Sequence, residues 1–128
     1  MNILLIDDEP IIHQSLGSFL RRVGHEVQIA LNGKEGLSRV MEQTPDLVIS
    51  DIKMPGLNGL DLLTHLKIHS PQIPVLLITG HGDMDTAVAA LQIGAHSYLC
   101  KPVKLDQLIE TVQVIEAQQN SLANPRAR

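Results

Sequence analysis

Hydrophobic and polar positions divide this chain of 128 residues into two kinds of alternating segment. Short apolar runs, typical of strands, occupy residues 3–6, 26–30, 46–50, 74–79 and 97–100. The stretches between them carry apolar residues at helical spacing, which predicts amphipathic helices. Strands that alternate strictly with helices predict a parallel sheet covered by helices on both faces, because parallel strands need crossover connections.

The order of the strands follows from how apolar each run is. Residues 3–6, 46–50 and 74–79 are largely continuous apolar runs, as expected for strands that are buried on both faces. Residues 26–30 include polar side chains and residues 97–100 form a short run, so we place these two strands at the edges. The sequence therefore predicts a doubly wound α/β domain, flavodoxin-like (βα)5, with five parallel strands in the order 2-1-3-4-5.

Residues suited to capping a helix mark where several of the helices begin. Asn32, Asn58 and Asp83 each precede a helical stretch, and we expect each side chain to accept a hydrogen bond from the first turn. The apolar periodicity fades near the end of the chain, which finishes with proline and basic residues. We therefore expect a domain over residues 1–118 and a tail, or the start of a linker, over residues 119–128.

The composition is that of a globular domain, with 44% hydrophobic and 19% charged residues. A formal net charge of −4 predicts that this domain itself binds no nucleic acid, because gripping a phosphate backbone needs clustered Lys and Arg. No apolar run approaches the ~18 residues that span a membrane, so we expect a cytoplasmic protein without membrane contact. The single cysteine, Cys100, lies in an apolar run and is expected to be buried.

Polar side chains follow four of the five predicted strands. Asp7, Asp8 and Glu9 come after the first strand, Asp51 after the third, Thr79 after the fourth and Lys101 after the fifth. The carboxyl ends of parallel strands meet at one edge of the sheet, where ligands bind near the reversal of strand order. The second strand, placed at an edge for unrelated reasons, is followed only by uncharged residues. We therefore predict one site built from these side chains.

Each of these residues alone has an ordinary structural explanation. Acids before Pro10 suit a helix start, and Asp51, Thr79 and Lys101 taken singly suit turns, strand ends or solvent. Together they are harder to explain, because two carboxylates ~5 Å apart repel by about 3 kcal/mol at an effective dielectric near 20. Oxygen ligands with open positions favour Mg²⁺, and Lys101 adds a second positive charge suited to phosphate.

The sequence resembles the receiver domains of response regulators in two-component signalling. The resemblance covers residues 2–117 and rests on "LLIDDEP", "DLVISDIKMPGLNGLDLL", "PVLLITGHGD" and "GAHSYLCKP". It implies that Asp51 accepts a phosphoryl group. It further implies that Asp8, Asp51 and the main-chain carbonyl of Lys53 bind Mg²⁺, and that Asp7 supports the ion through water.

The resemblance also implies a switch. Lys101 would contact the phosphoryl group, Thr79 would supply the switch hydroxyl, and Tyr98 would be the switch aromatic that turns inward. From spacing alone, Tyr98 is an edge-strand residue with its hydroxyl in water. The implied partners are a sensor histidine kinase or phosphotransfer protein and an output domain or partner protein, reached through the fourth helix, fifth strand and fifth helix. Homodimerisation through the same helices stays open.

Two further residues of the predicted rim are candidates for tuning the reaction. Lys53 lies two positions after Asp51, and His81 lies two positions after Thr79. We expect them to affect dephosphorylation by admitting or ordering the attacking water. The resemblance also raises the expectation that the Lys101–Pro102 bond is cis.

The six histidines raise the question of a transition-metal site. His65 and His69 are four positions apart on the predicted third helix and can share one face. Because the sequence offers no evident third ligand, we interpret both as exposed polar residues.

Three other functions remain open. A Mg²⁺-dependent phosphohydrolase would also use Asp51 as its nucleophile, but such enzymes usually need a second acid where Lys53 lies. A flavodoxin-like cofactor binder would need a phosphate-cradling loop in place of the acids after the first strand. A receiver-like scaffold that is never phosphorylated would not need the complete set of acids, threonine and lysine. The main prediction is a signalling switch that catalyses only its own phosphorylation and dephosphorylation.

Overall fold

A computed structural model describes residues 1–80 and 82–123 of the chain. Strands and helices alternate throughout, as the apolar pattern predicts. The elements are β1 (Asn2–Ile6), α1 (Pro10–Arg22), β2 (Glu26–Ala30), α2 (Gly33–Glu42), β3 (Leu47–Asp51), α3 (Gly59–His69), β4 (Val75–Thr79), α4 (Met84–Ile93), β5 (Ser97–Cys100) and α5 (Leu105–Ala123).

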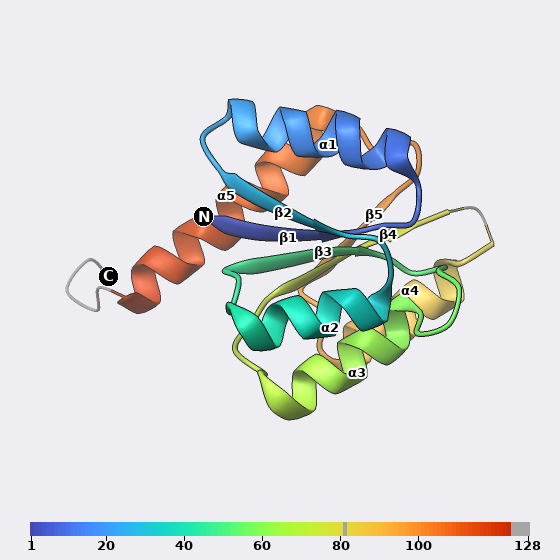
Figure 1. The fold of residues 1–128 in the computed structure, drawn as a ribbon. Helices are drawn as coiled ribbons and strands as arrows, with labels where there is room; N and C mark the ends of the chain where they lie inside the picture. The colour runs from blue at the N-terminus through green and yellow to red at the C-terminus, as the bar shows by residue number, and fades with distance from the viewer. Residues whose placement is uncertain (81, 124–128) are drawn as a thin grey trace.

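The sheet has five parallel strands in the order β2-β1-β3-β4-β5, which confirms the predicted α/β topology. Helices α1 and α5 cover one face, and α2, α3 and α4 cover the other (Figure 1). Every residue of β3 and β4 is buried, whereas β2 and β5 have exposed or half-buried positions. The most apolar runs are central because only central strands are covered on both faces.

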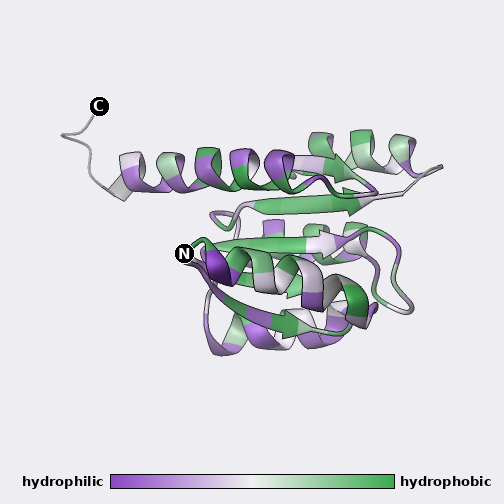
Figure 2. Ribbon diagram, turned by 90° about the horizontal axis from the view of Figure 1, so that it is seen from above, coloured by the Kyte–Doolittle hydropathy of each residue, from purple (hydrophilic) through white to green (hydrophobic). Residues whose placement is uncertain are grey.

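Each face of the sheet has its own hydrophobic core. Leu4, Val48 and Leu77 point to the side of α2, α3 and α4, and Leu5 and Ile49 point to the side of α1 and α5. The strands are accordingly mostly hydrophobic, with hydrophilic sections on some of them, whereas the helices carry alternating hydrophilic and hydrophobic stretches (Figure 2). This double burial holds the strand ends at fixed positions, so residues that follow the strands are placed precisely relative to each other.

Two of the three expected helix caps are present. Asn32 accepts a hydrogen bond of 2.8 Å from the Glu35 amide, and Asn58 accepts one of 2.9 Å from the Asp61 amide. The expectation for Asp83 was wrong, because its side chain makes no capping hydrogen bond to α4. Its carboxylate instead lies 3.3 Å from the Lys53 ammonium group.

The last strand and last helix differ in detail from the sequence prediction. Cys100 is exposed and not buried, because it ends the edge strand β5 and projects toward Met84, whose sulfur lies 3.7 Å from its own. Helix α5 continues to Ala123, past residue 118 where we expect the domain to end, so the boundary itself stays a prediction. Within the part of the chain that the structure describes, no helix is long and apolar enough to cross a membrane.

Candidate functional site

The acids after β1 approach the site from fixed backbone. Asp7 is fully buried, and its amide donates a 3.1 Å hydrogen bond to the Ala30 carbonyl at the end of β2. One carboxylate oxygen of Asp7 accepts a 2.8 Å hydrogen bond from the Glu9 amide. Asp8 and Glu9 are exposed, because the chain leaves the sheet here to enter α1. A buried acid and two solvated acids therefore stand together at this strand end.

Asp51 is the last residue of β3, in register with Ile78 of β4, and only 4% of it is exposed. Its Oδ1 accepts a 3.2 Å hydrogen bond from the Lys53 amide, and its Oδ2 lies 2.7 Å from the Lys101 ammonium. The sequence placed Asp51 just after the strand, whereas the structure includes it in the strand. The continuous apolar run of β3 thus carries one carboxylate to the rim of the sheet and leaves it nearly enclosed.

Four acids meet at this rim. Asp7, Asp8, Glu9 and Asp51 each offer a carboxylate oxygen, and these four atoms lie within 4.8 Å of one another. Among the described residues, Asp7 Oδ2 is buried and has no hydrogen-bond partner. An enclosed oxygen without a donor, beside other carboxylates, is what a hard cation such as Mg²⁺ needs from a protein. The donor set therefore fits the predicted metal.

The Asp7 carboxyl has a raised pKa. Burial raises its pKa from the usual 3.8 to about 6, and the Asp51 charge adds to that rise, while the hydrogen bond from the Glu9 amide opposes it. Desolvation disfavours the ionised form because the buried carboxylate has lost contact with water, and the charge of Lys101 offsets this only in part.

This shift predicts how the stability of the metal-free domain depends on pH. Because the folded-state pKa of Asp7 lies above its unfolded value of 3.8, folding takes up a proton between pH 3.8 and about 6, and stability falls as pH rises through this window. We expect Asp7→Asn to stabilise the chelator-treated domain near neutral pH, by on the order of 3 kcal/mol at most, with a smaller gain near pH 5. Urea unfolding of both proteins at the two pH values measures the difference.

The exposed neighbour Asp8 provides the matched control for this prediction. Asp8→Asn removes a solvated carboxylate and is expected to change stability less at neutral pH. An Asp7→Asn gain that does not shrink on acidification would contradict the assignment of the raised pKa to Asp7.

Lys101 is the cation that the structure brings to the acids. Besides its contact with Asp51, its ammonium lies 3.5 Å from a Glu9 carboxylate oxygen. Burial lowers the pKa of Lys101, but the hydrogen bond to Asp51 and the charges of Asp51, Asp7 and Glu9 outweigh burial, so that its pKa is raised. The lysine therefore stays charged beside Asp51.

A main-chain hydrogen bond links the end of β4 to the residue that follows β5. The Lys101 amide donates a 2.7 Å hydrogen bond to the Thr79 carbonyl, and the following Lys101–Pro102 bond is cis, as expected. Thr79 is fully buried, and its hydroxyl donates a 3.3 Å hydrogen bond to the Gly80 carbonyl. Tyr98 is half-buried and packs against the core on the side of α2, α3 and α4. It is therefore less exposed than its spacing alone predicts.

Of the two residues expected to tune dephosphorylation, the structure describes only Lys53. The Lys53 side chain is 77% exposed and its ammonium lies 3.3 Å from Asp83 Oδ1, so it points toward the start of α4 and not at Asp51. His81 lies outside the described residues. Glu9 is at the rim as predicted, although the sequence analysis assigns it no role of its own. The ion pair of Asp83 was not predicted, because it depends on a contact between loops that no local pattern reveals.

The chain matches a known domain family. A family model for the response regulator receiver domain matches residues 3–113. The chain belongs to this family. A receiver domain protein from Clostridium thermocellum has a TM-score of 0.90 and 39% identity, covering 94% of this chain and 98% of that one. The receiver domain of NtrX from Brucella abortus has a TM-score of 0.85 and 37% identity, covering 88% and 96%.

Longer relatives place the same domain in larger proteins. The DNA-binding transcriptional regulator NtrC of Salmonella typhimurium is 39% identical over 109 residues, which is 85% of this chain and 23% of that protein. The transcriptional regulatory protein ZraR of Klebsiella oxytoca is 41% identical over 108 residues, 84% of this chain and 24% of the relative. This receiver domain thus spans about a quarter of the length of these regulators.

Proposed function

We propose that this receiver domain is a phosphorylation-activated switch whose phosphoryl acceptor is Asp51. The observation that carries the proposal is the Asp51 carboxylate, nearly buried at a strand end with Lys101 at 2.7 Å and three other acids alongside. A carboxylate oxygen held in this way can attack the phosphorus of a phosphohistidine, forming an O–P bond as the N–P bond to the imidazole breaks. Family membership supports the same reading.

The acids would hold Mg²⁺ between them. Asp8, Asp51 and the main-chain carbonyl of Lys53 are the proposed ligands, and Asp7 would act through water. A bound Mg²⁺ would neutralise charge on the carboxylates and on the transferred phosphoryl oxygens. Lys101 would release its contact with Asp51 and donate to a phosphoryl oxygen, which it can do because its ammonium is a compact donor on a flexible stem.

The signal would leave the site through Thr79 and Tyr98. The Thr79 hydroxyl now donates to the adjacent Gly80 carbonyl, a contact that it can exchange for a phosphoryl oxygen. Its movement would make room near β5, and the half-buried Tyr98 would turn further inward. The surface changed in this way includes exposed apolar side chains of α4, among them Met84 and Val88, which suits contact with another protein surface.

The partners proposed for this switch are a sensor histidine kinase or phosphotransfer protein, acting in the cytoplasm, and an output domain or partner protein. Relatives in which the domain occupies about a quarter of the chain support a covalently attached output domain. A homodimer through α4 and α5 would use the same surface. We propose no turnover of other substrates, because Lys53 occupies the position where a phosphohydrolase would carry its second acid.

The intact mass of the domain tests this function. After incubation with a small acyl-phosphate donor, we expect one added phosphoryl group in the presence of Mg²⁺ and none in the presence of a chelator. A folded domain that binds no Mg²⁺ and gains no phosphoryl group under either condition would instead be a receiver-like scaffold.

Lys53 provides a prediction about the lifetime of the phosphoryl group. Its ammonium pairs with Asp83 across the rim beside Asp51, so its removal is expected to open this side of the site to water. We expect Lys53→Ala to shorten the lifetime of phosphorylated Asp51 several-fold, measured by loss of the adduct from the intact mass over time. Lys34→Ala, an exposed lysine of α2, is the control. An unchanged lifetime in Lys53→Ala would refute the tuning role, and the same experiment on a His81 variant tests the other candidate.

A further inference from the structure

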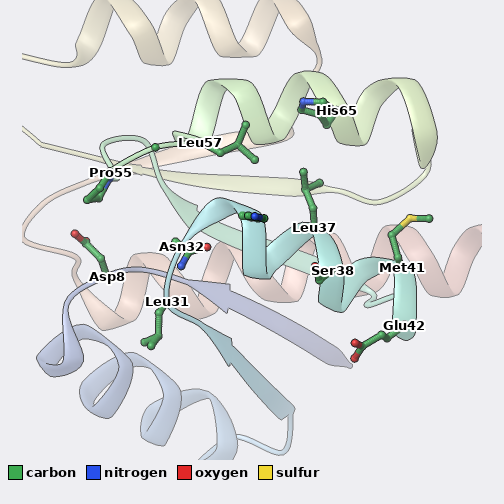
Figure 3. A pocket seen from close by; sticks show the side chains of 12 residues that line it. Asp8, Leu31, Asn32, Leu37, Ser38, Met41, Glu42, Pro55, Leu57 and His65 are labelled. Carbon is green, nitrogen blue, oxygen red and sulfur yellow. The ribbon is translucent and has the colours of Figure 1, made fainter.

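A groove on the face opposite α1 and α5 leads away from the acidic site. It encloses about 970 Å³ and begins at Asp8, passes the loop between β3 and α3, and continues between α2 and α3 to Met41 and His65 (Figure 3). A smaller cavity of about 230 Å³ adjoins its far end and is lined by Met41, His65 and His69. Two imidazoles and a thioether therefore line one cavity at the far end of the groove.

The two imidazoles are arranged as a pair. Their ring centroids lie 6.4 Å apart, and the ring planes differ by only 12°. Both side chains are exposed, and neither makes a hydrogen bond to another described residue. Rotation to a new rotamer therefore costs little, and the ring nitrogens are free to bind a ligand.

The backbone of α3 fixes the spacing of this pair. Histidines four positions apart on one helix face can bind the same metal ion through their ring nitrogens. Leu62 and Leu66, on the adjoining face of α3, are buried in the core, and the Ser70 amide closes the last turn with a 2.7 Å hydrogen bond to the Leu66 carbonyl. The helix that carries the pair is thus rigid, which lowers the entropy lost when both rings bind one ion.

We propose that His65 and His69 bind one transition-metal ion and that Met41 supplies a third ligand from α2. No further His, Cys, Asp or Glu joins the pair in the described part of the chain. Met41 lines both cavities with His65, is 78% exposed and has a flexible side chain. Glu42, the nearest acid along α2, points away from α3 (Figure 3).

The ligand set selects the ion. Imidazole nitrogens suit Zn²⁺, Ni²⁺ and copper, and a thioether shifts the preference toward copper. Divalent ions bind nitrogen sites most tightly at Cu²⁺, so affinity is expected to fall from Cu²⁺ to Ni²⁺ and Zn²⁺. The acidic site uses oxygen ligands, which suit Mg²⁺, so the two sites discriminate between hard and softer ions. An ion bound here would join α2 to α3 at the end of the groove remote from Asp8.

Calorimetric titration with Cu²⁺ tests this site, in a buffer with excess Mg²⁺ so that the acidic cluster is occupied. We expect one equivalent to bind the unmodified chain, and His65→Gln and His69→Gln each to weaken binding by at least about tenfold, since either change removes chelation. Met41→Leu is expected to weaken binding by a smaller factor, about threefold. Because these three side chains are exposed, we expect the variants to stay folded, and circular dichroism checks this.

His96→Gln is the matched control. The two ring nitrogens of His96 already contact Ser97 at 3.1 Å and Gln118 at 2.8 Å, so its replacement is expected to leave Cu²⁺ affinity unchanged. Undiminished affinity in both His65→Gln and His69→Gln would overturn the site, as would an equal loss in His96→Gln. Undiminished affinity in Met41→Leu would overturn the role of Met41.

Discussion

Asp51→Asn is expected to abolish phosphoryl transfer to this domain while leaving it folded. Asparagine has nearly the same shape as aspartate, so the end of β3 and the hydrogen bond from the Lys53 amide can be kept. Its amide has no anionic oxygen to attack phosphorus, and it also removes one proposed Mg²⁺ ligand. Intact mass after incubation with an acyl-phosphate donor and Mg²⁺ is the measurement, and we expect no adduct.

Asp61→Asn is the control for this loss. Asp61 is an exposed acid in the first turn of α3 and is not one of the four clustered acids, so the variant should gain one phosphoryl group as the unmodified chain does. An adduct of normal yield in Asp51→Asn would show that another residue accepts the phosphoryl group. Loss of the adduct in both variants would point to a general defect in folding or metal binding.

Gly59→Ala is expected to lower the free energy of unfolding by about 3 kcal/mol, the largest effect on stability that we predict. A Cβ at Gly59 would collide with the carbonyl oxygen of Asp51 and lie 2.8 Å from the Ile52 Cα. Both atoms belong to the backbone at the end of β3, so no side-chain rotation relieves the clash. Because the same backbone carries Asp51, we also expect weaker Mg²⁺ binding by this variant.

Gly17→Ala provides the opposite expectation at another helical glycine. The nearest atoms to a Cβ there lie 3.8 Å away, which is ordinary contact, and alanine favours the helix. We expect Gly17→Ala to raise stability by about 0.5–1 kcal/mol. Urea unfolding followed by circular dichroism compares the two variants, and equal stability changes would contradict the proposed clash at Gly59.

Much of the fold follows from local patterns in the sequence. The apolar runs of β1, β3 and β4 predicted that these strands are central, since only strands covered on both faces exclude polar residues along their length. The caps at Asn32 and Asn58 were predictable because a cap needs only a side chain and the turn that follows it. Asp51 and Lys101 were predicted to meet because parallel strands share one end of a sheet.

Tertiary structure decided what depends on contacts between distant segments. Asp83 follows the pattern of a cap, yet its backbone does not have the extended conformation of a cap residue, and its carboxylate pairs with the Lys53 ammonium at 3.3 Å instead. Burial is the largest cause of the rise in the pKa of Asp7 to about 6, and no sequence pattern measures enclosure. Likewise, Met41 lines one cavity with the histidines of α3 only because α2 packs beside α3. The sequence by itself determined which residues reach the rim of the sheet; packing determined which charges are desolvated there and which partners they face.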